Sequence, residues 1–222
     1  MIPSWAPMYS WWILDGTMKK LRWVDDSLGK PSDKVAGLVI YIALVMISMG
    51  VLSGGTVKIT YTRLSELTGL SRDLIRRGTG VLVAIGVINV ERDGRNNIYK
   101  IVNASELKKG GWCKIPVKQL LNENGKSIDA FKELKLRKKV ELHALKIFLY
   151  LAAIRENHTE YSQATYPTIR NAVGVPDRDI SRALTLLQLV GLLQRVSTEK
   201  VENGKLNEPN KYYLRGYTSF TR

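Results

Sequence analysis

Two stretches of the chain repeat the same pattern of apolar and polar positions. They align without a gap at an offset of 105 residues, the spacing that separates Gly69 from Gly174 and Gly86 from Gly191. Few residues are identical, but the matches fall on glycines and apolar positions, where backbone geometry and packing are strict. The pattern predicts one structural unit that occurs twice.

The first copy predicts a definite order of elements. These are a helix at 32–49, a strand at 57–60, helices at 63–68 and 72–85, and strands at 87–92 and 96–102. Gly69 suits the left-handed position after a helix, and Asp93-Gly94 is a strong hairpin signal. In the third helix, Ile75, Leu82 and Ile85 fall on one stripe, which we expect to face the core.

The second copy predicts the same order. Its elements are a helix at 141–157, a strand near 162–165, helices at 167–173 and 177–190, and strands at 192–197 and 211–215, with a longer polar hairpin loop at 198–210. Helix, strand, helix, tight turn, helix and β-hairpin is the order of a winged helix-turn-helix. We therefore expect an α+β, mostly helical chain with two such domains in tandem. The predicted parts are an aromatic segment plus the first domain at 1–105, a basic connector at 106–137, and the second domain at 138–222.

The segment 35–49 is nearly all apolar and raises the alternative of a transmembrane helix. It is shorter than the roughly 20 residues that a span requires, and it ends at Gly50 and at Ser53-Gly54-Gly55. Its counterpart at 142–157 is amphipathic and carries Lys146 and Arg155. The comparison predicts a buried helix and no membrane partner.

Charge points to a polyanionic partner. Lys and Arg number 34 against 20 Asp and Glu, for a net charge of +14. The single cysteine excludes an intrachain disulfide, and the two histidines, His143 and His158, leave little material for a metal or catalytic cluster. No P-loop and no secretory signal are present. We expect a cytoplasmic, nucleoid-associated protein without enzyme activity, cofactor or metal.

The stretch LSELTGLSRDLIRRGTGVLVAIGVI at 64–88 resembles the turn and recognition helix of bacterial winged-helix regulators. Each unit follows a short aromatic or Ile-Pro segment (Trp11-Trp12-Ile13-Leu14; Trp112 and Ile115-Pro116), and this doubled arrangement resembles the tandem winged-helix replication initiators of plasmids and phages. The resemblance covers about 30–105 and 138–217. It implies binding to repeated origin sequences, often with one unit also serving dimerisation.

Candidate DNA contacts follow from the chemistry of a recognition helix, whose N-terminal residues read base edges in the major groove. Arginine suits guanine, and asparagine suits adenine. On the first unit the candidates are Ser71, Arg72, Asp73, Arg76 and Arg77 on the helix, and Arg92, Arg95, Asn96 and Asn97 on the hairpin. Gly78 and Gly80 are unusual inside a helix. They are consistent with a close backbone approach to DNA or to a partner, or with a weak helix.

The second unit and the connector supply further candidates. On the second unit they are Arg170, Arg178, Ser181, Arg182, Lys200 and Lys205, while Asp177 and Asp179 favour helix capping over phosphate contact. Within 106–140, ten basic residues stand against four acidic ones, and the run Lys132–Lys139 has helical character. Lys135, Arg137, Lys138 and Lys139 are predicted to follow the DNA backbone. The alternative is a solubilising linker and a solvated surface.

Four of the five tryptophans lie in the first 23 residues. They pack against the first helix, form a dimer contact or stack on single-stranded bases. The predicted partners are double-stranded DNA, a second copy of the chain through the N-terminal domain, and host replication proteins. The preferred function is sequence-specific DNA binding that initiates replication of a plasmid, phage or other mobile element. The alternatives are a transcriptional repressor or regulator, and a protein-interaction module in a replication or segregation complex.

Overall fold

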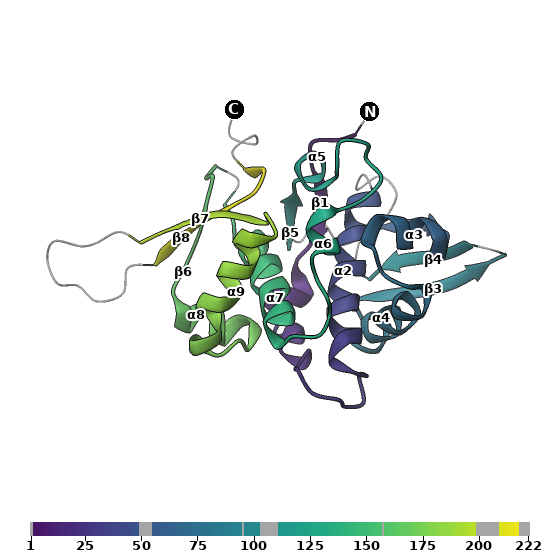
Figure 1. Ribbon diagram of the computed structural model, residues 1–222, viewed down its shortest axis with the longest axis horizontal. Helices are drawn as coiled ribbons and strands as arrows, with labels where there is room; N and C mark the ends of the chain where they lie inside the picture. Colours follow the sequence, from purple (N-terminus) through teal and green to yellow (C-terminus); the bar gives the residue numbers. More distant parts are fainter. Residues whose placement is uncertain are drawn as a thin grey trace, which may run out of the picture.

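The computed structural model describes residues 2–48, 55–94, 96–102, 111–156, 158–198 and 209–217. These residues form an α+β fold of helices and small antiparallel sheets, as the sequence predicts. Helices α2 (Pro31–Ile47) and α7 (Lys139–Ala153), one from each repeated unit, pack against each other at the centre of the molecule (Figure 1). Buried apolar side chains from both units form one cluster around them.

The first unit has the predicted order of elements. After α2 come β2 (Thr56–Ile59), α3 (Tyr61–Thr68), α4 (Arg72–Ala84), β3 (Ile88–Asp93) and β4 (Asn96–Ile101). Strand β4 lies between β2 and β3 and is antiparallel to both. Thr60 Oγ1 accepts a hydrogen bond from the Arg63 amide at 3.1 Å, so α3 begins slightly earlier than predicted. Gly69, with φ at 74°, ends α3 where expected.

The second unit repeats this order with β6 (Ser162–Ala164), α8 (Tyr166–Val173), α9 (Asp177–Leu189), β7 (Leu193–Ser197) and β8 (Asn210–Leu214). Strand β8 lies between β6 and β7. Thr165 caps α8 as Thr60 caps α3, and Gly174 takes a φ of 69° at its end. An offset of 105 residues places α3 on α8 and α4 on α9 without any insertion. Residues 199–208 of the predicted polar loop lie outside the described residues.

The apolar segment that suggested a membrane span is a buried helix. Every residue of α2 from Asp33 to Met46 is buried, because α4 packs on one side of the helix and α7 on another. Within the described part of the chain, none of the helices combines the length and the apolar character that a membrane crossing requires.

Glycines set the crossing of α2 and α4. A Cβ atom at Gly78 would lie 2.8 Å from the Gly37 nitrogen and 2.9 Å from the Ala36 carbonyl carbon. Gly78 therefore allows the two helix backbones to touch, which explains a residue that otherwise weakens a helix. Gly80 has open space around its Cα, with nothing within 4 Å of a Cβ built there. The close approach at Gly78 is thus made within the chain, to α2, and not to DNA or a partner as the sequence suggested.

The N-terminal segment packs across both central helices. It comprises β1 (Ala6–Tyr9), α1 (Trp11–Leu14) and the 3-10 helix η1 (Thr17–Lys20). Trp12 is fully buried and meets Tyr41 of α2 edge-on, with ring centroids 4.9 Å apart. The Lys146 ammonium of α7 donates to the Leu21 carbonyl at 3.0 Å. Trp12 thus packs in the core, as the packing interpretation of the tryptophans predicts.

The predicted connector contains elements of its own. These are β5 (Trp112–Ile115), which pairs antiparallel with β1, and the short helices α5 (Val117–Leu120) and α6 (Asp129–Lys132). The helical character predicted for Lys132–Lys139 was wrong, because α6 ends at Lys132 and α7 begins at Lys139. Between these helices Leu136 takes a φ of 57°, which breaks a helix.

Candidate nucleic-acid interface

The N-termini of α4 and α9 lie at the same end of the molecule. An ion pair between Arg77 and Asp33 holds α4 near the start of α2, and one between Asp179 and Lys139 holds α9 near the start of α7. In Figure 1 the starts of α2 and α7 both lie at the lower end of the view, with the loop that leads into α7 between them. The predicted contacts of both helices and of the connector therefore share one end of the molecule.

On α4, most of the positive charge is neutralised internally. Arg77 is bound by two carboxylates: its Nε contacts Asp33 Oδ1 at 2.9 Å, and its Nη1 forms an ion pair with Asp73. Arg76 Nη2 donates to the same Asp73 at 3.0 Å. Because the Asp33 side chain is only 5% exposed, the Arg77 guanidinium is committed to a structural contact. Arg77 and Asp73 are thus placed to hold α4 against α2.

The remaining candidates on α4 are open to solvent. Ser71 is the N-cap, and its Oγ accepts from the Leu74 amide at 3.3 Å. Arg72 is exposed, with Nη2 donating to Thr62 Oγ1 at 2.9 Å, and it forms no ion pair among the described residues. A hydroxyl partner leaves the full charge of Arg72 available to a phosphate or a guanine edge.

On α9, the corresponding arginines are not neutralised. The offset of 105 residues places Arg182 on Arg77, and it replaces Asp73 with Arg178 and Asp33 with Lys138. Both acidic partners of the first unit are therefore basic in the second. Arg178, Arg182 and Lys138 are exposed and form no ion pair among the residues that the structure describes.

The acidic residues of α9 have other partners. Asp177 accepts from Arg170 Nη1 at 2.8 Å. Asp179 forms an ion pair with Lys139 at 2.8 Å and lies 3.6 Å from His143 Nδ1. Lys139 holds the pKa of Asp179 below its usual range, whereas burial lowers the pKa of His143 to about 4. At neutral pH, Asp179 is therefore charged and His143 is neutral.

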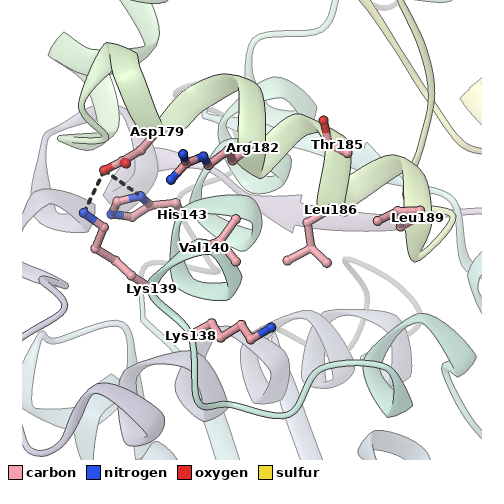
Figure 2. A pocket seen from close by; sticks show the side chains of 9 residues that line it. All are labelled: Lys138, Lys139, Val140, His143, Asp179, Arg182, Thr185, Leu186 and Leu189. Carbon is pink, nitrogen blue, oxygen red and sulfur yellow. Dashed lines mark ion pairs between the residues drawn. The ribbon is translucent and has the colours of Figure 1, made fainter.

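A groove of about 480 Å³ lies between α7 and α9, where the first unit has its Arg77–Asp33 contact (Figure 2). Val140, Leu186 and Leu189 form an apolar part of its lining, and Leu189 is 78% exposed. Lys138 and Arg182 line the groove as well. It thus combines positive charge without a carboxylate partner and an apolar surface that has no covering segment among the described residues.

The loop before α7 is held by a carboxylate. The amides of Lys135 and Leu136 donate to Glu141 Oε1 at 2.5 and 3.0 Å, and those of Arg137 and Lys138 donate to Oε2 at 2.7 and 2.8 Å. Four consecutive N–H groups thus surround one buried side chain. The side chains of Lys135, Arg137 and Lys138 are exposed, as a phosphate-contacting role requires, whereas the ammonium of Lys139, also exposed, forms the ion pair with Asp179.

One of the predicted hairpin contacts is buried. Arg92 is exposed and Asn96 half-buried, but Asn97 is only 7% exposed and its amide lies 3.4 Å from the Tyr99 hydroxyl. Asn97 lies on the inner face of the sheet, so its prediction as a DNA contact was wrong. Arg95, Lys200 and Lys205 lie outside the described residues. Ser181 is exposed on α9, beside Thr185, whose hydroxyl donates to the Ser181 carbonyl at 3.1 Å.

Sequence reasoning missed two features of this end of the molecule. One is the internal neutralisation of Arg76 and Arg77 by Asp73 and Asp33. Without these ion pairs in view, α4 looked like the more basic helix. The other is the reversal of charge between the two units. Comparing charges as well as apolar residues at the offset of 105 would have revealed the second feature. In the described part of the chain, no group of three or more His, Cys, Asp or Glu side chains is placed to hold a metal ion.

Comparison with known protein families, with curated proteins and with solved structures gives no match for this chain.

Proposed function

We propose that this protein is a tandem winged-helix protein that binds double-stranded DNA in a sequence-specific manner. The order helix, strand, helix, helix and hairpin in both units supports the fold assignment. The observation that carries the function is the cluster of Lys138, Arg178 and Arg182, which occupies the positions of one arginine and two acids in the first unit. The first unit neutralises this site internally, whereas the second unit leaves it positive. The second unit therefore has the charge to bind an anion.

The anion is a DNA backbone, because the cluster lies in the first half of α9 and beside the basic loop 135–138. Phosphate contacts from Lys135, Arg137 and Lys138 position α9, while Arg178 and Arg182, one helical turn apart, reach base edges. On the first unit the proposed contact is Arg72 at the start of α4, at the position that Asp177 occupies in α9. The second unit is thus proposed to contribute most of the specificity, and the first to orient the protein on the duplex.

Selection of binding sites from a random duplex library tests this proposal with the full chain. We expect one enriched motif, and we expect Arg178→Ala/Arg182→Ala to lose affinity for it by about 10- to 100-fold, since each base contact is worth about 1–3 kcal/mol. The matched control is Lys118→Ala/Lys126→Ala, which removes two exposed charges elsewhere. No enrichment, together with no duplex binding in low salt, would refute the proposal.

The role in replication initiation is a further proposal that a footprint on the DNA flanking the gene can test. Several direct repeats beside an AT-rich stretch would support an initiator. A single palindrome over a promoter would support a transcriptional regulator instead.

A further inference from the structure

The outer faces of the two three-stranded sheets differ in chemistry. In both sheets the inner residues are buried against the helices, so the alternate residues face outward. In the first unit this outer face is neutralised by ion pairs, Lys58 with Asp93 and Lys100 with Glu91, each at 2.5 Å. In the second unit the same face carries aromatic rings and cations.

Four side chains form a continuous row across the second sheet. Tyr161, which precedes β6, and Tyr213 of β8 lie with ring centroids 5.5 Å apart at an interplanar angle of 54°. The Arg195 guanidinium of β7 lies 3.7 Å from the Tyr213 centroid, and the Lys211 ammonium lies 5.1 Å from the Tyr161 centroid. We call this row the aromatic face. Two neighbouring rings thus lie between two cations, on a sheet face that is partly open to solvent.

We propose that the aromatic face binds single-stranded nucleic acid. Unpaired bases stack on tyrosine rings and on the planar guanidinium of arginine, and a phosphate is attracted by the positive charge of Arg195. Arg195 is exposed and forms no ion pair in the described part of the chain, so the outer plane of its guanidinium is open to a base. Duplex DNA does not fit this chemistry, because its bases are already stacked.

This site is separate from the proposed duplex interface. The latter is built from α9, α7 and the loop before α7, whereas the aromatic face is built from strands and the residue before β6. The two proposals can therefore fail independently. A protein with both sites would hold a duplex and an unpaired strand at different surfaces.

The test is fluorescence anisotropy of the full chain with labelled dT20, labelled rU20 and a labelled duplex of equal length. We expect binding to at least one single strand, and we expect Tyr161→Leu/Tyr213→Leu to weaken it by about tenfold or more, because each stacked base contributes appreciably. Tyr161→Phe/Tyr213→Phe should stay within about twofold of the unsubstituted protein, since the rings remain. Duplex affinity should be unchanged in both variants. Tighter binding of dT20 would identify the strand as DNA, and tighter binding of rU20 as RNA.

The matched control is Lys58→Gln/Lys100→Gln on the outer face of the first sheet, which should keep its single-strand affinity. If the leucine variant fails to fold, Arg195→Gln and photocrosslinking of 5-iodouracil DNA to the unsubstituted protein replace it. The expected crosslinks are then at Tyr161 or Tyr213. The proposal is overturned if neither single strand binds, if the leucine variant binds as tightly as the unsubstituted protein, or if crosslinks map elsewhere.

Discussion

Replacing Gly78 with alanine should destabilise the fold, whereas the same change at Gly80 should stabilise it. Both residues lie in α4, so alanine improves the helical propensity of each by about 1 kcal/mol. At Gly78 the new methyl group would lie 2.8–2.9 Å from the backbone of α2 and from Ile40 Cδ1. Backbone cannot move aside as a side chain can, so α4 must shift away from α2. At Gly80 nothing lies within 4 Å of the added atom.

The expected magnitudes follow from these contacts. Overpacking costs about 1–3 kcal/mol, which after the gain in propensity leaves Gly78→Ala less stable by up to about 2 kcal/mol. Gly80→Ala should be more stable by about 0.5–1 kcal/mol. For a chain of this size, 1 kcal/mol corresponds to about 2–4 °C in Tm. Urea unfolding followed by tryptophan fluorescence, together with calorimetry, measures both. Equal stability of the two variants would refute the close crossing of α2 and α4.

Four further predictions concern single side chains. Arg77→Ala should lower the free energy of unfolding by about 1–3 kcal/mol, because the buried Asp33 carboxylate loses this ion pair. Arg182→Ala should change it by less than about 0.5 kcal/mol, and equal effects in urea unfolding would contradict the structural role of the Arg77–Asp33 pair. Glu141→Gln removes one of the two oxygens that bind the amides of 135–138. It should lower the free energy of unfolding by about 2 kcal/mol and speed hydrogen exchange of these amides. Unchanged exchange would exclude Glu141 as the anchor of this loop. Burial lowers the pKa of Lys146 to about 7. Between pH 7 and its ordinary value near 10.5, the unfolded chain therefore binds a proton that the folded chain does not. The free energy of unfolding should rise by about 1.4 kcal/mol per pH unit in that window, and this rise should vanish in Lys146→Met. Burial raises the pKa of the Cys113 thiol to about 12, so it should react with iodoacetamide at about pH 8 only after unfolding; rapid labelling of the native protein would contradict its burial.

The order of elements could be predicted from the sequence because local signals determine it. Gly69 and Gly174 end helices in a left-handed conformation, and Asp93-Gly94 turns a hairpin, in ways that depend little on distant residues. The buried state of α2 was predicted by comparison with 142–157, which looked amphipathic. In the structure α7 is itself buried from Glu141 to Ala152, with Lys146 inside the core, so that part of the prediction was wrong. These inferences needed only periodicity and turn chemistry.

The partners of charged and small residues could not be predicted in the same way. Arg77 looked like a DNA contact because its partner Asp33 is 44 residues away in sequence. The run Lys132–Lys139 looked helical because its composition favours a helix, but the Glu141 carboxylate binds four of its amides and overrides that propensity. The role of Gly78 depends on the position of α2, which the sequence does not give. In each case the local structure is determined by a contact with a residue distant in the sequence, or by hydrogen bonds from the backbone to a side chain.

The salt dependence of duplex binding tests the central claim most directly. Affinity for the selected duplex is measured over a range of salt concentrations for the unsubstituted protein, for Lys138→Gln/Arg182→Gln and for the control Lys118→Gln/Lys126→Gln, which removes the same amount of charge. Because Lys138 is assigned to a phosphate and Arg182 to a base edge, the slope of log K against log salt should fall by roughly 0.9 in this variant, and the control should keep the full slope. An unchanged slope in Lys138→Gln/Arg182→Gln, or an equal reduction in the control, would contradict the assignment of this cluster to DNA.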